Sequence, residues 1–279
     1  MMLCYTRSMT NLLLGTSGYD YPEWRGVFYP AHLKRDDFLL YYSTIFNAVE
    51  LNFSFYGMPN PKQIISFYER SEGRLFFSMK ANRLLTHEIS SGWKESANDF
   101  KNAVSPLLEK SALCAVLFQF PQSFRYVTEN RFYLSALLKE FKEFPCVVEF
   151  RHREWIRQSV FEGLNEHGAG IVFCDMPSCP ALPDGKTLRT PFIGKNAYIR
   201  MHGRNAKAWY ASASEEQKTA NGAARYTYDY SEVELQSFVP VVCQSIKEGR
   251  KTQVFFNNHP DGSGAKNARR LGEIIKASL

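Results

Sequence analysis

Short apolar runs rich in β-branched and aromatic residues alternate along this chain with longer amphipathic stretches. Eight such runs predict strands, at residues 12–18, 48–54, 75–81, 114–120, 146–151, 170–176, 197–203 and 252–258. Helical patterns lie between most of them, including 36–46, a segment that opens at Pro61, 129–144, 155–167, 231–247 and 265–277. Strands that alternate with helices indicate βαβ units and a parallel sheet. Eight strands predict an α/β fold closed into a single (β/α)8 TIM barrel.

The pattern is irregular in a few places. The segment between Met176 and Ala197 is rich in proline and has no clear helical periodicity, so we expect one irregular crossover between strands six and seven. Two loops are long, 19–35 after strand one and 204–230 after strand seven. The aromatic and arginine content of the second favours an ordered, lid-like loop over disorder. Without a linker or repeat, residues 1–279 are expected to form one domain, with 1–11 as a lead-in.

Composition and charge narrow the class of protein only slightly. A length of 279 residues suits one α/β barrel, and an aromatic fraction of 15% fits either a barrel core or ligand stacking. The net charge is +6 and the isoelectric point is about 8.9. This balance fits an anionic small molecule, and nucleic acid is a second possible partner. No run of five Lys or Arg residues exists, which excludes a basic nucleic-acid-binding tail.

Cysteine spacing and the N-terminal segment bear on localisation. The six cysteines have no CxxC or zinc-finger spacing, and the first apolar run is too short for a signal peptide or a membrane span. We therefore expect a reduced, cytoplasmic protein without a membrane partner, and no feature indicates a protein partner. Met9 is an alternative start of the chain.

Three polar residues within predicted strands are the candidate catalytic groups, because TIM-barrel sites lie at the C-terminal ends of the strands. Glu149 and Lys80 stand in apolar runs, where a charge is costly unless it is paired or reaches a solvated pocket. His202 lies two residues after Arg200, on the same face of strand seven, and suits acid/base work or phosphate binding. The alternatives are an internal ion pair for the two charges and a structural core histidine for His202.

The candidate substrate-binding residues share a position at a strand end or in a long loop. They are Ser17, Trp24, Glu50, Asn52, Tyr56, Gln119, Arg151, Arg200, Arg204, Trp209, Tyr228, Asn257 and Asn258. For Glu50 the alternative is an outward orientation toward the helices, and for Tyr56 it is simple packing. The glycines around Ser17 could cradle an anion with their N–H groups.

Metal and cofactor chemistry is restricted by the same residues. Two carboxylates with one imidazole suit Mg²⁺ or Mn²⁺, so Glu149, Asp175 and His202 are candidate ligands of a single divalent metal. The sequence has no Walker loop, Rossmann fingerprint or HExxH zinc motif, and we expect no nucleotide cofactor. It also has no GxSxG motif for a serine nucleophile.

Eight motifs carry a family resemblance that spans nearly the whole chain. They are GTSGYDYPEWRGVFYP (15–30), VELNFSFYGMP (49–59), FFSMKANRLLTHE (76–88), LFQFPQSF (117–124), VEFRHREW (148–155), YIRMHGRN (198–205), YDYSEVEL (228–235) and VFFNNHPDGSGAKNARRL (254–271). In these the chain resembles the YecE-like family of uncharacterised TIM barrels, also called domain of unknown function seventy-two. The resemblance implies a bacterial-type TIM barrel with a polar pocket at the strand C-termini, and it implies no particular reaction.

Three functions remain open at this point. The first is an enzyme that acts on a phosphorylated or sugar-like small molecule by acid/base chemistry, as a hydrolase, lyase or isomerase. The second is nucleic-acid binding or phosphodiester processing, by analogy with endonuclease IV-like barrels, although a trinuclear zinc site is not expected from six histidines of which several lie outside the strands. The third is a metabolite sensor without catalysis.

Overall fold

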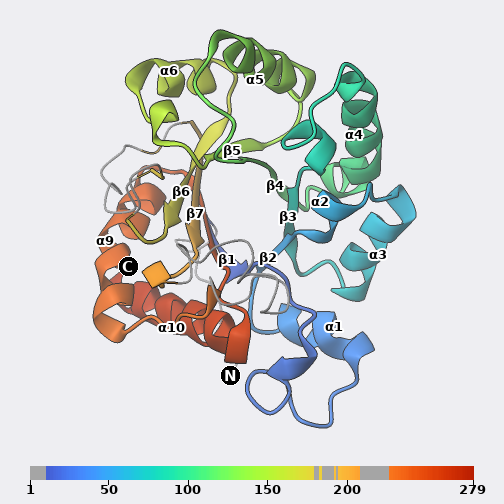
Figure 1. The fold of residues 1–279 in the computed structure, drawn as a ribbon. Helices are drawn as coiled ribbons and strands as arrows, with labels where there is room; N and C mark the ends of the chain where they lie inside the picture. Colours follow the sequence, from blue (N-terminus) through green and yellow to red (C-terminus); the bar gives the residue numbers. More distant parts are fainter. Residues whose placement is uncertain (1–10, 179–181, 184–191, 193, 208–225) are drawn as a thin grey trace.

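The computed structural model describes residues 11–178, 182–183, 192, 194–207 and 226–279. Its eight parallel strands form a (β/α)8 TIM barrel, with the sheet order β1-β8-β7-β6-β5-β4-β3-β2 (Figure 1). The strands are β1 (Leu12–Thr16), β2 (Ala48–Leu51), β3 (Phe76–Lys80), β4 (Leu113–Phe120), β5 (Cys146–Phe150), β6 (Gly170–Asp175), β7 (Asn196–Met201) and β8 (Lys251–Phe256). The fold predicted from the hydrophobic pattern is confirmed.

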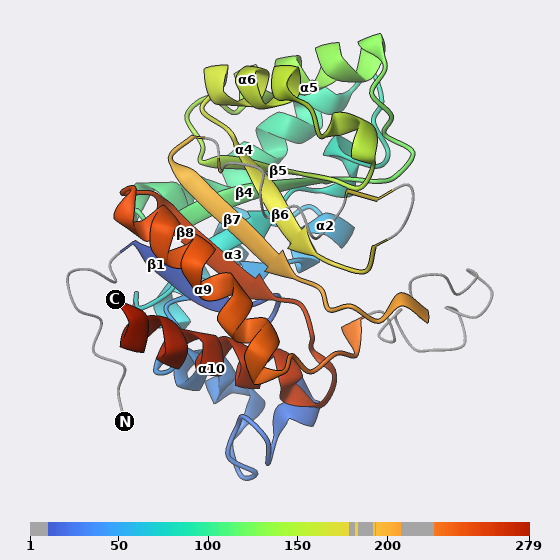
Figure 2. The ribbon, with the colours of Figure 1, turned by 90° about the vertical axis from the view of Figure 1, so that its left-hand side faces the viewer.

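The α-helices lie around the outside of the sheet. They are α1 (Phe38–Ser43), α2 (Phe53–Tyr56), α3 (Pro61–Arg70), α4 (Trp93–Glu109), α5 (Thr128–Glu140), α6 (Gln158–Glu166), α9 (Glu232–Lys247) and α10 (Ser263–Ser278). The last two pack against each other and against β8, as Figure 2 shows from the side. Among the described residues, no helix combines the length and the apolar character needed to cross a membrane.

The strands are shorter than their apolar runs. The predicted strand 48–54 ends at Leu51, because α2 begins at Phe53, and the predicted strand 252–258 ends at Phe256. The polar residues that follow leave the sheet and form the mouth of the barrel. The predicted lead-in is undescribed over residues 1–10, and most of the 176–197 crossover and residues 208–225 of the predicted lid also lie outside the described residues.

Alternation along each strand separates the barrel interior from the layer beneath the helices. Val147 of β5 packs in a small interior cluster with side chains from the other strands, among them Ala48 and Tyr198. Val148 belongs instead to the larger cluster that joins the sheet to the helices. Because side chains alternate between the two faces, Glu149 points inward, two residues after Val147. The same parity places Glu50 of β2 and Arg200 of β7 in the barrel interior with Glu149.

Between β1 and β2 the barrel is closed largely by the side chain of Tyr42, from α1. Its hydroxyl accepts a hydrogen bond from Thr16 N at 2.8 Å and donates one to Ala48 O at 3.0 Å. A Cβ at Gly15 would overlap the Ala48 carbonyl oxygen, so the close approach of the two strands requires glycine there. The phenol therefore satisfies backbone groups that a regular ladder would pair directly.

Asn47 acts in the same way one step lower in the barrel. Its Oδ1 accepts from Leu14 N at 2.9 Å, and its Nδ2 donates to Leu12 O at 2.8 Å. Direct backbone pairing resumes only at the mouth, where Gly18 N donates to Glu50 O at 2.8 Å. The register of β1 against β2 is thus set by two side chains and one terminal backbone bond.

Candidate functional site

A chain of four charged side chains crosses the barrel interior near the C-terminal ends of the strands. Arg200 of β7 donates from Nη1 to Glu149 Oε2 and from Nη2 to Glu50 Oε1, both at 2.7 Å. Arg151 forms a second ion pair with Glu149, with 2.5 Å between its Nε and Oε1. Both carboxylates are fully buried, and Arg200 is 2% exposed. The charges are therefore balanced by one another and not by water.

Glu50 is held by hydroxyl groups as well as by Arg200. Tyr198 OH donates to Glu50 Oε2 at 2.7 Å and is itself bonded to Ser78 Oγ at 2.7 Å. Ser17 Oγ donates to the other oxygen, Oε1, which Asn52 Nδ2 also reaches at 3.2 Å. Glu50 thus points into the barrel, and the alternative outward orientation is wrong.

Opposite charges decide the ionisation of both carboxylates. Burial by itself would raise the pKa of Glu149, but the guanidinium groups of Arg151 and Arg200 outweigh burial and hold this pKa well below its ordinary value. Arg200 has the same effect on Glu50, whose pKa is also lowered despite complete burial. Both groups are carboxylates at neutral pH, and their ion pairs make them weak proton acceptors.

Lys80, at the end of β3, is a cation of the mouth without an ion pair in the part of the chain that the structure describes. Its Nζ donates to Gln119 Oε1 at 2.8 Å and lies 4.1 Å from the centre of the Phe55 ring. Among the described residues no carboxylate lies within ion-pair distance of this amine. Lys80 as a whole residue is only partly buried, while its amine is largely desolvated.

The environment of Lys80 weakens its hold on a proton. Burial is the largest cause and the positive charge of Arg200 adds to it, while Glu149 and Glu50 act in the opposite sense. Together they lower the pKa of the Lys80 ammonium to about 7. An amine with this pKa is present in both protonation states at neutral pH, which suits proton transfer or nucleophilic attack.

His202 lies in the same interior layer but is buried and neutral. Burial, followed by the charges of Arg151 and Arg200, lowers its pKa to about 3. Arg151 Nη2 lies 3.1 Å from His202 Nε2, and Asn257 Nδ2 lies 3.1 Å from Nδ1. Because a guanidinium can only donate, Nε2 is an acceptor and the ring proton belongs on Nδ1. The Asn257 carboxamide is then turned so that its Oδ1 accepts from Nδ1.

The three candidate metal ligands are not brought together. Glu149 Oε1 and His202 Nε2 are 3.8 Å apart, and the strand-six residue that joins them is Cys174, with ligand atoms within 4.8 Å of one another. Asp175 points to the other face of β6, where it accepts from Arg204 at 2.9 Å. Arg151 also contacts both Glu149 and His202, so a divalent cation would have to displace a guanidinium. This arrangement does not suit a metal.

Arg204 and Tyr228 fix the two ends of the 204–230 loop against the barrel. Arg204 pairs with Asp175 and with Glu234, while Tyr228 OH donates to Glu234 Oε1 at 2.6 Å. Tyr230 completes the anchor, because its hydroxyl donates to Asp175 Oδ2 at 2.7 Å and accepts from the backbone of the strand-seven end. The side chains of Arg204 and Tyr228, both predicted to bind substrate, are therefore engaged in structural contacts.

The remaining candidates fall into different places. Trp24, within the first loop, is fully buried and donates to His259 O at 2.7 Å, so its indole N–H already has a partner. Tyr56 is 75% exposed on the rim. Asn258 is buried and donates to Tyr226 O at 3.2 Å, which supports the returning loop. Trp209 lies outside the described residues.

Comparison with known proteins bears directly on the motifs that run through this site. Residues 13–278 match the family described as protein of unknown function DUF72. The chain belongs to the DUF72 family. The resemblance inferred from the eight sequence motifs is confirmed over nearly the whole chain.

Two kinds of relative support this membership. The UPF0759 protein YunF of Bacillus subtilis (strain 168) is 28% identical over 256 residues, which is 88% of this chain and 89% of that protein. The crystal structure of a DUF72 family protein from Thermotoga maritima is similar at 33% identity, with a TM-score of 0.80 over 95% of this chain and 99% of that chain. A DUF72 structure from Enterococcus faecalis shares the fold at 24% identity, with a TM-score of 0.77 over 95% of both chains. These names give a family and no reaction.

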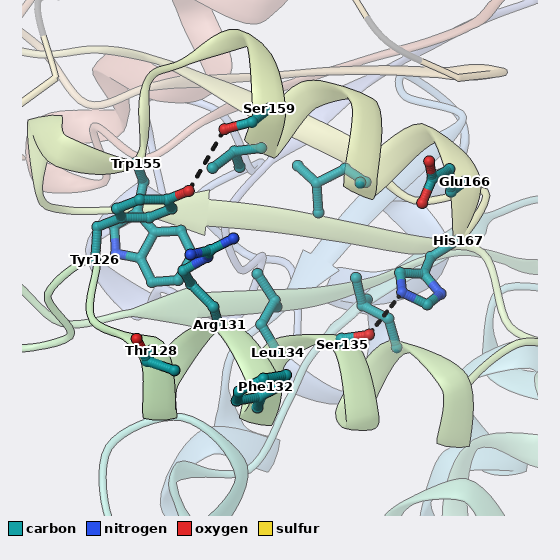
Figure 3. A pocket seen from close by; sticks show the side chains of 14 residues that line it. Tyr126, Thr128, Arg131, Phe132, Leu134, Ser135, Trp155, Ser159, Glu166 and His167 are labelled. Atoms are coloured by element: carbon teal, nitrogen blue, oxygen red, sulfur yellow. Dashed lines mark hydrogen bonds between the residues drawn. The ribbon is translucent and has the colours of Figure 1, made fainter.

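A separate pocket of about 300 Å³ lies outside the barrel, between α5 and α6. Figure 3 shows Tyr126 and Trp155 at one end and His167, bonded to Ser135 Oγ at 3.0 Å, at the other. Arg131 lies over the Tyr126 ring at 5.0 Å. The pocket contains none of the interior charges of this DUF72 protein, so the barrel mouth is the better candidate site.

Two mouth residues of the DUF72 chain, Phe55 and His87, are not among the candidates selected from the strand ends and long loops. The ring of Phe55 faces the Lys80 amine. His87 packs edge-on against Phe55 at 4.8 Å, and burial together with Lys80 lowers its pKa to about 4. Both follow strand ends by several residues, and their only signal was a place in a βα loop.

Proposed function

We propose that the mouth of the barrel binds a phosphorylated or otherwise anionic small molecule and that Lys80 transfers protons on it. The observation that carries this proposal is the amine of Lys80, which belongs to a partly exposed residue at the C-terminal end of β3 and has no carboxylate partner among the described residues. Around it, three cations (Lys80, Arg151 and Arg200) face two carboxylates (Glu50 and Glu149), which leaves one positive charge for a ligand. A partly desolvated cation of this kind favours an anion.

The ion pairs divide the roles of the charged groups. Glu149 is saturated by two guanidinium groups, so we assign it to positioning Arg151 and Arg200, and the acid/base role passes to Lys80. His202, neutral and bonded to Arg151, is a positioning residue in the same sense. The expected acid or base role of Glu149 and His202 is thereby replaced by one that fits their contacts.

Polar groups without charge suit the rest of a sugar-like ligand. The side-chain amides of Asn52, Gln119 and Asn257 come from β2, β4 and β8 or the residues just after them. Amides can both donate to and accept from hydroxyl groups, which is how proteins orient polyols. A phosphate near Lys80 and Arg151 with hydroxyls toward these amides is the binding mode we propose.

Calorimetric titration tests the binding step. We expect the wild-type protein to bind inorganic phosphate and hexose phosphates, and Lys80→Met to lose at least about tenfold in affinity because the unpaired cation is gone. The matched control is Lys62→Met, at an exposed position of α3, which should bind as the wild type does. The proposal would be overturned if the wild-type protein bound neither inorganic phosphate nor hexose phosphates, or if Lys80→Met bound them with the affinity of the wild type.

The two alternative functions predict different results in the same experiment. Nucleic-acid binding predicts a steep loss of DNA affinity with salt, as counterions are released. Arg200 is buried inside the barrel, so it cannot contact a duplex backbone. A metabolite sensor predicts tight binding with no product after prolonged incubation. Binding with turnover that Lys80→Met abolishes supports the enzyme.

A further inference from the structure

We infer that Lys80 is also a nucleophile, whose amine forms an imine with the carbonyl carbon of a phosphorylated aldehyde or ketone. This inference rests on the proposed function, because the phosphate group is what brings the carbonyl to the mouth. Three observations point to it: the place of the amine, the groups that hold it and the charges around it.

The amine is held in a fixed position without being neutralised. Gln119 Oε1 accepts one of its hydrogens at 2.8 Å, and the face of Phe55 covers it at 4.1 Å. Neither contact removes the nitrogen lone pair once a proton has left, since a carbonyl oxygen only accepts and a ring face attracts only the cation. A lysine kept for structure alone would be expected to reach a carboxylate, and Lys80 reaches none among the described residues.

Burial, together with the neighbouring cations, lowers the pKa of the Lys80 amine against the opposing effect of Glu149 and Glu50. Arg200 and Arg151 both act against the protonated form of Lys80, in addition to burial. An amine is nucleophilic only when neutral, and proximity to other cations in a desolvated site is an established means of activating lysine. Arg151, while paired with Glu149 and His202, adds positive charge to the mouth. A phosphate attracted by this charge would bring the carbonyl next to the amine.

The step is balanced without any further reactant. The Nζ lone pair attacks the carbonyl carbon, a C–N bond forms and the C=O electron pair moves to oxygen. Both hydrogens of the amine then leave with that oxygen as water, which gives a C=N bond. The imine nitrogen then takes up from solvent the proton that the ammonium released before the attack. The protonated imine therefore carries the charge that the ammonium carried before, and Glu149 and Glu50 stabilise it as they stabilise the ammonium.

Reductive trapping tests this inference. The full-length protein is incubated at pH 7 with glyceraldehyde 3-phosphate and cyanoborohydride, and adducts are located by peptide mass spectrometry. We expect Lys80 to be modified about tenfold or more faster than the exposed Lys62, because far more of its amine is neutral at this pH. Glyceraldehyde, which lacks the phosphate, should modify Lys80 more slowly. The rate at Lys80 should level off above pH 8, whereas that at Lys62 should keep rising.

A conservative variant separates this inference from the proposed function. Lys80→Arg keeps a positive charge at the mouth but has no nucleophilic amine, so it should still bind inorganic phosphate and give no adduct at position 80. Wild-type protein that binds phosphate while its adducts are spread over surface lysines would overturn the imine and leave the anion site intact. Wild-type protein that does not bind phosphate would overturn the proposed function itself.

Discussion

Arg200 Nη1 lies 2.7 Å from Glu149 Oε2 in the barrel interior, where solvent reaches neither side chain. An ion pair in this setting stabilises the fold little compared with a well-packed apolar pair, but removal of one partner leaves a buried charge without compensation. The pair is therefore better understood as the support that orients Arg151 and Arg200 than as a source of stability.

Glu149→Gln should lower the free energy of unfolding by about 3 kcal/mol, because it leaves two guanidinium groups facing a neutral amide. Urea denaturation measures this, with Glu143→Gln at an exposed position as the control. The double variant Glu149→Gln, Arg151→Met should recover part of the loss, since one unpaired charge is gone. A loss below about 0.5 kcal/mol for Glu149→Gln would show that water enters and screens the pair.

Lys80→Met should raise the free energy of unfolding at pH 7 by about 1 kcal/mol, although we expect it to weaken phosphate binding. The folded pKa of Lys80, about 7, is below its value of 10.5 in the unfolded chain, so protonation favours the unfolded state between these values. The penalty is lost as pH rises toward 10.5, and the advantage of the variant should shrink accordingly. Lys80→Arg, which keeps the charge, should show no such gain. A variant less stable than the wild type at pH 7 would contradict the desolvation of this amine.

His202 should make the protein sensitive to acid. Its folded pKa of about 3 lies below the ordinary value of 6.5. Between these pH values His202 is protonated in the unfolded chain but stays neutral in the native state. This contribution to stability is present above pH 6.5 and is lost as pH falls toward 3. Between pH 6.5 and 4.5, His202→Gln should lose about 2 kcal/mol less than the wild type. His32→Gln, at an exposed position, is the control, and equal pH slopes for all three proteins would refute the assignment.

Tyr42→Phe should cost about 1 to 3 kcal/mol, because Thr16 N and Ala48 O lose their common partner inside the barrel. Chemical denaturation compares it with Tyr41→Phe on the same helix, a partly exposed tyrosine that should be nearly neutral. If both variants are equally stable, the two strands close without the phenol.

The part of the site that could be predicted from the sequence was the set of charged residues within apolar strands. Glu149, Lys80 and Arg200 could be selected because their neighbours are apolar, and parity along a strand then brings them to one interior layer. Their partners could not be predicted, since Glu50 and Arg200 are 150 residues apart in sequence. The run that ends in Cys174 and Asp175 does not reveal which of the two faces inward, because both faces of a barrel strand are buried.

Aromatic residues in the loops were harder to place for a different physical reason. Trp24 and Phe55 both follow a strand, and an indole or a phenyl ring can cover a ligand or fill the space beneath its own loop. The choice depends on how the loop returns to the barrel. In the structure Trp24 is buried and Phe55 faces Lys80. Neither outcome could be predicted from the local composition.

The Tyr42 and Asn47 contacts give the boundary between β1 and β2 an unusual sensitivity to chain length. An ordinary ladder can slide by two residues and regain its backbone bonds, but a phenol and a carboxamide projecting from a helix and its following turn fit one alignment only. Insertions or deletions between Tyr42 and Ala48 would therefore shift the shear of the whole barrel and misalign Ser17 with Glu50 at the mouth. In protein engineering, this short turn should be the connection least tolerant of a grafted sequence. The backbone amides near Thr16 should exchange with deuterium only as often as the hydrogen bond to the Tyr42 hydroxyl opens.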